Sequence, residues 1–409
     1  MIDHDDLSPD QRAAYDAIAA WFNLGKMAPG QSDRMCLTLG GYAGCGKTTL
    51  VALLARELGD GATFAAYTGK ATSVLRKKFA ALGLSPEVST LHSLLYKPVE
   101  LPSGRVHFEP KGALRRRGGG EYKLIVVDEA SMVPREMHEM LVAHGVPVLA
   151  VGDHGQLPPV FGTFNLMERP VIRLEKIHRQ AEGNPILRVA HAVRGQGDVS
   201  ERWADGERVI FVKDDAGMDR MLERFYGGSP DPGAIAERSL ICYTNRVRSM
   251  LNAHARQMLH GQAPALVEDG ERVVCLRNAW SEGVYNGLQG FMRRAVKMGS
   301  DRLRVEFLEE ASRDVGPELI VSAHQFGQPK TFQEFEELKK HMGRTPSSWT
   351  DVGLLFDYGY AMTGHRSQGD QWNDVAVVLP RGGMEHDVWK RWCYTSFSRA
   401  VERLWVVVA

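Results

Sequence analysis

Short apolar runs alternate with longer segments of helical period through the first 150 residues. The apolar runs predict buried strands at residues 35–39, 63–67, 123–127 and 146–151. The periodic segments predict helices at residues 47–58, 71–82 and 133–143. Strands that alternate with helices in this way are typical of an α/β fold with a parallel, doubly wound sheet.

The same rhythm returns later in the chain, with two interruptions. Strands are predicted at 239–243, 374–379 and 404–408, and a helix at 246–259. Proline and glycine break the pattern at 97–120, which predicts an inserted hairpin or projecting loop. Short β-like runs between about 261 and 350 predict a small inserted β-barrel.

Composition narrows the class of protein. The chain has 409 residues, of which 44% are hydrophobic and 24% charged, as in a globular protein. No stretch reaches the roughly 20 apolar residues that span a bilayer, and the acidic start does not resemble a targeting segment. Five cysteines without a C-x-x-C pair fit a reducing compartment. We therefore expect a cytoplasmic protein that does not bind membranes.

Residues 41–48 fit the phosphate-binding pattern G-x-x-x-x-G-K-[ST], after a predicted strand and before a predicted helix. The backbone of Gly44, Cys45 and Gly46 is expected to surround phosphates, and Lys47 to reach the β- and γ-phosphates. The Thr48 hydroxyl is expected to hold Mg²⁺. The alternative is a glycine-rich turn that fits the pattern by chance, which the flanking elements disfavour.

Two further strand ends carry candidate chemistry. Asp128 and Glu129 follow a predicted strand, where Asp128 can hold Mg²⁺ and Glu129 can polarise the attacking water. The alternative is an acidic cap for the next helix. Gln156 follows the next strand, where it can sense the γ-phosphate; the alternative is a surface loop ended by prolines. Arg179 and Arg399 can stabilise transition-state charge across a cleft, whereas an arginine taken at random is simply solvated.

These motifs, in this order, resemble superfamily 1 helicases, within the 5′→3′ branch of RecD-like and phage Dda-like enzymes. The segments that carry the resemblance are residues 7–14, 41–49, 67–71, 89–94, 124–129, 151–159, 177–180, 242–245, 360–369 and 394–400. The resemblance implies two RecA-like parallel-sheet domains at 1–165 and 166–409. A hairpin subdomain would lie at about 97–120 and an SH3-like barrel at about 261–350.

The resemblance also assigns roles to individual residues. It implies that ATP contacts Gln11, as the adenine reader, and Thr49, Gly369, Arg179 and Arg399, the two arginines acting as fingers. Small hydroxyl residues at strand or loop ends suit contacts to phosphate oxygens that do not read sequence. With the motif neighbours, the predicted DNA contacts are Thr68, Lys70, Thr90, His92, Ser93, Thr244, Asn245, Asn286, Thr363, His365 and Ser367.

The sequence therefore predicts an ATP- and Mg²⁺-dependent helicase that moves along single-stranded DNA and opens duplex at junctions. We expect a monomer working with replication or recombination proteins, and the compact length indicates a phage or bacterial source. The balance of 50 basic and 50 acidic residues favours one alternative, a nucleotide-switched DNA-binding ATPase without processive unwinding. An RNA-directed helicase is a further alternative.

Overall fold

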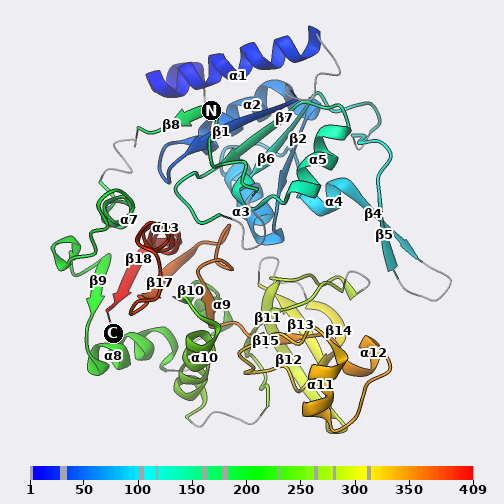
Figure 1. Cartoon of the computed structure of the whole chain (residues 1–409), viewed down its shortest axis with the longest axis vertical. Coiled ribbons are helices and arrows are strands. Elements are labelled where there is room, and N and C mark those ends of the chain that lie inside the picture. The colour runs from blue at the N-terminus through cyan, green and yellow to red at the C-terminus, as the bar shows by residue number, and fades with distance from the viewer. Residues whose placement is uncertain are drawn as a thin grey trace. The chain divides into compact units, whose positions relative to one another are not determined.

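The computed structural model describes residues 3–27, 35–100, 106–116, 118–158, 164–176, 183–228, 231–261, 266–279, 282–310 and 315–408. The chain forms two compact units (Figure 1). Unit 1 comprises Met1–Asp198, Gln368–Asp370 and His386–Ser398. Unit 2 comprises Val199–Ser367, Gln371–Glu385 and Arg399–Ala409. The chain therefore returns twice to unit 1 after leaving it.

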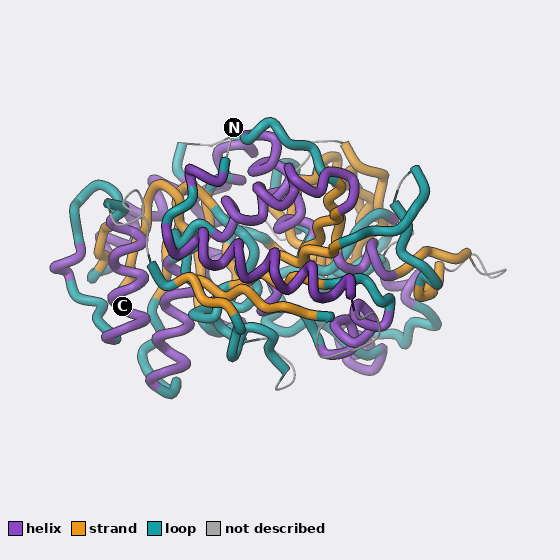
Figure 2. Tube along the Cα trace, turned by 90° about the horizontal axis from the view of Figure 1, so that it is seen from above, coloured by secondary structure: helices purple, strands orange, loops and turns teal. Residues whose placement is uncertain are grey.

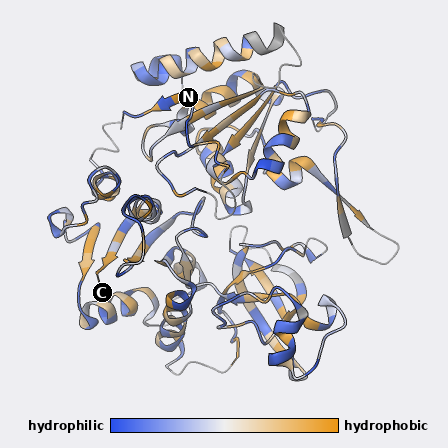
Figure 3. Ribbon diagram, viewed as in Figure 1, coloured by the Kyte–Doolittle hydropathy of each residue, from blue (hydrophilic) through white to orange (hydrophobic). Residues whose placement is uncertain are grey.

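Unit 1 is built on a six-stranded parallel sheet in the order β3-β2-β6-β7-β1-β8. Its strands are β1 (Cys36–Gly41), β2 (Ala62–Ala66), β3 (Glu87–Thr90), β6 (Leu124–Asp128), β7 (Val148–Gly152) and β8 (Ile172–Leu174). The central strands are mostly apolar, as Figure 3 shows, because both faces of a parallel sheet are covered.

Helices alternate with most of these strands along the chain. Figure 2 distinguishes the helices, strands and loops of the trace by colour. The helices of unit 1 are α1 (Pro9–Met27), α2 (Lys47–Leu58), α3 (Gly69–Ala81), α4 (Leu91–Leu95), α5 (Arg135–Ala143), α7 (Pro185–Gln196) and α13 (His386–Phe397). The 3₁₀ turns among the described residues of both units are η1 (His4–Asp6), η3 (Gly59–Gly61), η4 (Ala130–Met132) and η5 (Glu201–Trp203). Two apolar clusters fill the sides of the sheet, one around Leu39 and Leu50 and one around Ile125 and Leu141.

An antiparallel pair, β4 (Tyr96–Glu100) and β5 (Val106–Pro110), extends away from the parallel sheet of unit 1 (Figure 1). It falls where proline and glycine interrupt the helical pattern of the sequence. The ring of His92 stacks on Tyr96 at a centroid distance of 4.5 Å and meets Phe108 edge-on at 4.9 Å. These aromatic contacts fix the base of the hairpin to α4.

Unit 2 contains a five-stranded parallel sheet in the order β16-β10-β17-β18-β9. Its strands are β9 (Val209–Val212), β10 (Arg238–Cys242), β16 (Ala361–Thr363), β17 (Trp372–Val378) and β18 (Ala400–Val407). Its helices are α8 (Asp215–Tyr226), α9 (Pro232–Ala236) and α10 (Asn245–His260). The α/β fold with parallel sheets that the sequence predicts is thereby confirmed.

A second sheet in unit 2 is antiparallel, in the order β14-β13-β12-β11-β15. Its strands are β11 (Arg272–Cys275), β12 (Gln289–Met298), β13 (Arg302–Glu309), β14 (Val315–Ser322) and β15 (Phe356–Tyr358). Two helices, α11 (Phe335–Met342) and α12 (Trp349–Val352), lie between β14 and β15 in the chain. One apolar cluster, including Leu240, Val273 and Phe307, is shared by both sheets of the unit. The antiparallel sheet is therefore an integral part of unit 2.

Candidate functional site

The phosphate loop, residues 41–46, runs from the last residue of β1 to the start of α2 and has the backbone shape that phosphate binding requires. Gly44 (φ 85°) and Gly46 (φ 76°) adopt left-handed conformations that favour glycine. A Cβ on Gly41 would lie 3.1 Å from both the Cβ and the carbonyl oxygen of Leu174. The loop leads directly into the N-terminus of α2, where amide groups and the helix dipole attract anions.

Lys47 lies against the first half of this loop. Its Nζ donates hydrogen bonds to the carbonyl oxygens of Gly41 (2.5 Å) and Tyr42 (2.9 Å). The ammonium group is thereby held beside the loop amides, where it can meet a phosphate as a fixed positive charge. Thr48 and Thr49 follow in the first turn of α2, and the Thr49 amide donates to the Gly46 carbonyl oxygen at 3.0 Å.

Gln11, which α1 carries, also reaches the loop. It is 3% exposed, and its Nε2 lies 3.3 Å from the Gly46 carbonyl oxygen. Its Oε1 accepts a hydrogen bond of 3.0 Å from the Ser8 amide. Both ends of the carboxamide are therefore fixed, which brings the predicted adenine reader next to the loop that it is expected to serve.

Two carboxylates stand at the carboxyl end of β6. Asp128 ends the strand, and its Oδ1 accepts from the Glu129 amide at 3.0 Å. Glu129 has a φ of 52°, which is rare for a residue other than glycine and is typical of strain at functional positions. In the sheet order β6-β7-β1, all carboxyl ends share one edge, so these carboxylates and the phosphate loop lie at the same edge.

The loop after β7 completes this edge. Asp153 is 3% exposed and Gln156 4% exposed. The Asp153 carboxylate accepts from the Gly155 amide (2.8 Å) and from Gln156 Nε2 (3.4 Å). Gln156 is thus anchored in a buried position in the loop that follows β7, the strand between β6 and β1. The sequence motifs at 41–48, 128–129 and 156 are brought together as their strand ends predict.

Helix α13 supplies Tyr394, which opens the motif at 394–400 but to which the sequence analysis assigned no role. Tyr394 is fully buried; its hydroxyl accepts from the Ala43 amide at 2.7 Å and donates to Asp153 Oδ2 at 2.6 Å. The next residue, Thr395, accepts from the Leu157 amide at 3.0 Å. From α7, His191 Nε2 lies 3.1 Å from the Ala43 carbonyl oxygen. These contacts join residues 351, 238 and 148 positions apart in the chain, so local sequence patterns do not predict them.

The aromatic residues around the loop include two histidines with displaced pKa values. The Tyr42 ring lies 4.4 Å from His154 and 5.5 Å from His191 between centroids. Burial lowers the pKa of both histidines, with Asp153 opposing that shift. Because a carbonyl oxygen only accepts, the neutral His191 must carry its proton on Nε2.

This donor set fits a nucleotide with a divalent ion. The backbone amides of the glycine-rich loop, the Lys47 ammonium group and the N-terminus of α2 suit the binding of phosphates. A hydroxyl in the first turn of α2 and a carboxylate at a strand end suit Mg²⁺, which takes one or two protein ligands beside phosphate and water. Among the described residues, no group of three or more His, Cys, Asp or Glu side chains could hold a metal alone.

The predicted DNA contacts of unit 1 have structural partners. Thr68 caps α3 by accepting from the Ala71 amide at 3.1 Å, and Lys70 Nζ lies 3.7 Å from Asp370. Thr90 caps α4 by accepting from the Ser93 amide at 3.1 Å. Burial lowers the pKa of His92. Since β2 and β3 are neighbours, the two capping threonines lie at one edge of the sheet.

Gly369, predicted to contact ATP, lies near the cap of α3. Its φ is 78°, and a Cβ there would approach Thr68 Oγ1 to 3.4 Å and the Ala71 Cβ to 3.2 Å. The preceding Gln368 is 3% exposed and donates to the Leu157 carbonyl oxygen at 2.8 Å. Residues 368–370 of unit 1 thus join the loop after β7 to the start of α3.

The predicted DNA contacts of unit 2 gather partly at one sheet edge. Thr244 caps α10 by accepting from the Val247 amide at 3.3 Å, and Thr363 ends the neighbouring strand β16. Ser367 is fully buried and donates to the Gly364 carbonyl oxygen, while burial lowers the pKa of His365. Asn286 stands apart on a turn of the antiparallel sheet, where its amide bonds to Asn278.

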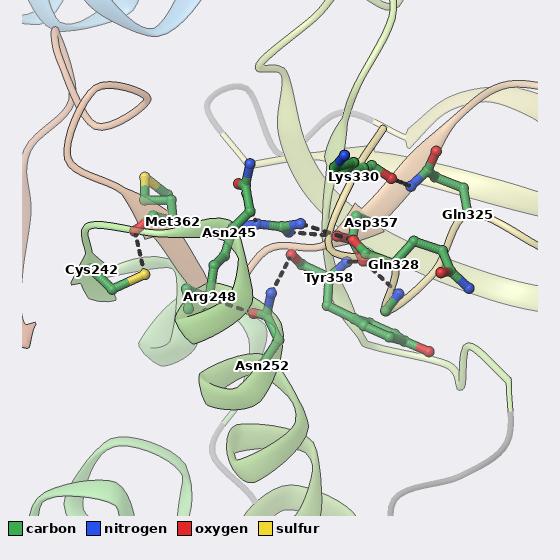
Figure 4. Close-up of polar contacts among 12 residues, drawn as sticks. Cys242, Asn245, Arg248, Asn252, Gln325, Gln328, Lys330, Asp357, Tyr358 and Met362 are labelled. Carbon is green, nitrogen blue, oxygen red and sulfur yellow. Dashed lines mark hydrogen bonds and ion pairs between the residues drawn. The ribbon is translucent and has the colours of Figure 1, made fainter. Parts of the chain in front are cut away.

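Asn245 belongs to a polar network that joins α10 to the antiparallel sheet (Figure 4). Arg248 donates to Asn245 Oδ1 (3.3 Å), to Asp357 Oδ2 (2.5 Å) and to the Gln328 carbonyl oxygen (3.1 Å). One turn on, Asn252 bonds to the Tyr358 carbonyl oxygen and the Ala361 amide. The N-terminus of α10 is therefore held in place by β15 and by the loop between β14 and α11.

The two predicted arginine fingers are not placed at this site. Arg179 lies outside the described residues. Arg399 belongs to unit 2, where it is 4% exposed and its carbonyl oxygen accepts from the Trp372 amide at 3.0 Å. Both roles stay predictions, as do the individual DNA contacts.

The parallel sheet and the loop at its carboxyl edge define a P-loop protein that uses nucleotides. The chain belongs to the AAA domain family, whose model matches residues 6–214. A model of the UvrD-like helicase C-terminal domain matches residues 358–407. Both matches agree with the resemblance that the motifs carry.

One curated relative is the ATP-dependent RecD2 DNA helicase of Deinococcus radiodurans. It is 29% identical over 388 residues, which cover 90% of this chain and 46% of the relative. The chain therefore spans less than half the length of that protein. The match confirms the resemblance to superfamily 1 helicases of the RecD type.

Solved structures share the fold. The Pif1 helicase from Bacteroides in complex with ADP-AlF3 and single-stranded DNA has a TM-score of 0.50 at 18% identity, and covers 98% of this chain and 92% of its own. Bacteroides Pif1 bound to single-stranded DNA gives the same values.

In the described part of this chain, no helix has the length and apolar character needed to cross a membrane.

Proposed function

We propose that this protein is an ATP-dependent DNA helicase that moves 5′→3′ along single-stranded DNA and separates duplex. The observation that carries the proposal is the meeting of the phosphate loop, the Asp128–Glu129 pair and Gln156 at one edge of the sheet of unit 1. The similarity to a RecD2 DNA helicase along most of the chain supports DNA as the second substrate.

The nucleotide site would bind ATP through the amides of residues 44–49 and Lys47. Thr48 and Asp128 would hold Mg²⁺, which when bound neutralises charge on the β- and γ-phosphates. The constrained carboxamide of Gln11 would meet the base. Lys47, already held by two carbonyl oxygens, would stabilise the charge that develops as the γ-phosphate leaves.

Hydrolysis requires a water positioned for attack on the γ-phosphate. Glu129, whose left-handed backbone follows directly on Asp128, would orient this water and accept its proton. Gln156 would sense the γ-phosphate. Arg179 and Arg399 would complete the charge compensation, since in-line phosphoryl transfer depends on positioning and electrostatic stabilisation.

Movement on DNA would follow from domain closure. The predicted RecA-like domains, 1–165 and 166–409, would both bind the same single strand of DNA. They would do so through hydroxyl residues such as Thr68, Thr90 and Thr244, which would contact phosphates without reading sequence. ATP binding would close the domains and hydrolysis would reopen them. The β4–β5 hairpin, which overlaps the predicted insertion at 97–120, would act as the wedge. The antiparallel sheet of unit 2 would be an SH3-like barrel.

The first test compares Lys47→Ala with a control, Lys123→Ala, at an exposed lysine directly before β6. Lys47→Ala is expected to lower DNA-stimulated ATP hydrolysis by at least about a hundredfold and to abolish unwinding with the fold intact, because it removes a charge that faces the phosphates. The control should retain both activities. Unwinding by Lys47→Ala would overturn the proposal.

The second test uses matched duplexes with 5′ or 3′ single-stranded tails. Unwinding should require ATP and a 5′ tail, and a preference for the 3′ tail would overturn the proposed polarity. ATPase rates with and without single-stranded DNA distinguish the alternative. A rate that DNA leaves unchanged would favour a nucleotide-switched binding module over a motor.

A further inference from the structure

We infer that Tyr394 is a positioning residue that joins the phosphate loop to the Gln156 loop, so that the protein distinguishes a nucleoside triphosphate from a diphosphate. The inference deepens the proposed function, on which it rests for the identity of the nucleotide. The observation behind it is that the Tyr394 hydroxyl both accepts and donates a hydrogen bond, each with a different loop of the proposed nucleotide site.

The phenol bridges two backbone segments. It accepts the hydrogen of the Ala43 amide in the phosphate loop (2.7 Å) and donates its own hydrogen to Asp153 Oδ2 (2.6 Å). Asp153 in turn accepts from the Gly155 amide and the Gln156 side chain. A continuous path of hydrogen bonds thus runs from Ala43 through Tyr394 and Asp153 to Gln156.

The packing around the phenol leaves little room for these groups to move separately. Tyr394 is fully buried, and its ring lies 5.9 Å from Tyr42 and 5.7 Å from His191 between centroids. A Cβ on Gly155 would come within 3.0 Å of both the Tyr42 and Tyr394 rings. Since close-packed groups move together, a displacement of the phosphate loop must be felt in the loop after β7.

The bridge lies at the end of the loop where a γ-phosphate is expected. Lys47 Nζ, which reaches β- and γ-phosphates in such loops, contacts the carbonyl oxygens of Gly41 and Tyr42. Ala43 is the next residue, and Gln156 is the predicted γ-phosphate sensor. A diphosphate lacks the group that both ends of the bridge would meet, so losing the bridge should weaken triphosphate binding selectively.

Helix α13, which carries Tyr394, makes further contacts with the loop after β7. Besides Tyr394, Thr395 accepts from the Leu157 amide (3.0 Å), and Arg391 donates to the carbonyl oxygens of His154 (3.3 Å) and Gln156 (3.4 Å). All of these partners lie in the loop after β7. Five residues beyond Tyr394 along the chain is Arg399, the predicted second finger. The position of α13 is therefore set by the same loop that carries the sensor.

The test measures the affinity of the full chain for fluorescent ADP and for a non-hydrolysable fluorescent ATP analogue, both with Mg²⁺. Tyr394→Phe keeps the ring and removes the hydroxyl. It is expected to lower the ratio of triphosphate to diphosphate affinity by at least about fivefold, with ADP affinity within about twofold of the wild-type value. Tyr122→Phe is the matched control, because Tyr122 is also buried and its hydroxyl donates to Glu87 at 2.9 Å.

An unchanged or increased ratio in Tyr394→Phe, or equal loss of both affinities, would overturn the inference. The first result would show that the phenol has no role in discrimination, and the second that it merely maintains the loop. Should Tyr394→Phe fail to fold, Asp153→Asn weakens the same bridge and is judged by the same ratio. The readout is binding, so a wild-type chain without ATPase activity would refute the proposed function while this ratio still decides the inference.

Discussion

Glu129, the proposed catalytic carboxylate, adopts an unusual backbone conformation. Glu129 and Arg294 are the two non-glycine residues with positive φ in the described part of the chain, at 52° and 50°. Holding a residue with a side chain there costs about 1–3 kcal/mol. Glu129 stands at the proposed water-positioning point, whereas Arg294 lies at an exposed bulge of β12. The same strain therefore occurs once at the site and once away from it.

Glu129→Asn should raise stability and remove hydrolysis, because asparagine tolerates this conformation but cannot accept the proton. We expect a gain of about 1 kcal/mol in the free energy of unfolding, measured by urea denaturation. Arg294→Asn is the control, with a similar gain and normal ATPase activity, since exposed ion pairs contribute little. A loss of stability in both variants would contradict this account of the strain.

The two histidines beside Tyr42 make unit 1 sensitive to acid. Burial lowers the folded-state pKa of His154 and His191, so the unfolded chain binds more protons between the folded value and about 6.5. Their contribution to stability is complete above about pH 6.5 and is lost as the pH falls toward the folded pKa. The double variant His154→Gln, His191→Gln should lose less stability between pH 7.5 and 5.5 in urea denaturation. An equal or greater loss would contradict the prediction.

At the scale of elements, several predicted DNA contacts turn out to be helix caps. Thr68, Thr90 and Thr244 each accept a backbone hydrogen bond at the start of α3, α4 and α10. Each helix follows the carboxyl end of a parallel strand, so one side chain can serve as cap and face the edge where ligands bind. Capping and phosphate contact are therefore compatible roles, and substitution can separate them.

Thr244→Asp should preserve the cap and repel DNA. Aspartate is an effective cap, and this chain already uses Asp214 and Asp231 in that role for α8 and α9. We expect stability within about 0.5 kcal/mol of wild type and weaker single-stranded DNA binding in a fluorescence anisotropy titration. Thr244→Ser is the control and should change neither quantity. Unchanged DNA affinity in Thr244→Asp would remove Thr244 from the set of contacts.

The sequence predicted the central elements well and the edges poorly. The helix predicted at 47–58 is α2 itself, and the strand predicted at 123–127 is β6 within one residue, because continuous burial leaves a continuous apolar run. β3 and β8 were missed, since they are short, partly polar strands at the two edges of the sheet. β15 joins the antiparallel sheet although it lies beyond residue 350, because pairing with β11 is a long-range contact.

At the scale of the whole molecule, the chain path explains what sequence reasoning could find at the site. Motifs that follow neighbouring strands, such as 41–48 and 128–129, are predictable because parallel strands end at one edge. Tyr394 is not predictable, because only the return of residues 386–398 to unit 1 brings it to the phosphate loop. That return also makes unit 1 discontinuous in sequence.

A fragment of residues 1–198 should therefore be less stable than unit 1 in the full chain. It would lack α13, whose buried face includes Trp392, Tyr394 and Phe397, and would leave Asp153 without its phenol partner. We expect a lower midpoint of thermal unfolding and binding of a dye that detects exposed apolar surface. Attaching residues 386–398 through a flexible linker should restore the midpoint. A fragment as stable as the linked form would contradict this expectation.

The late return of α13 also has a consequence for synthesis of the protein. A ribosome completes residues 1–198 long before it adds residues 386–398, with most of unit 2 made in between. During that interval the nascent chain carries a phosphate loop whose Ala43 amide cannot yet meet the Tyr394 hydroxyl. With the role proposed for Tyr394, selective triphosphate binding would begin only after residues 386–398 have been made and have packed onto the rest of unit 1.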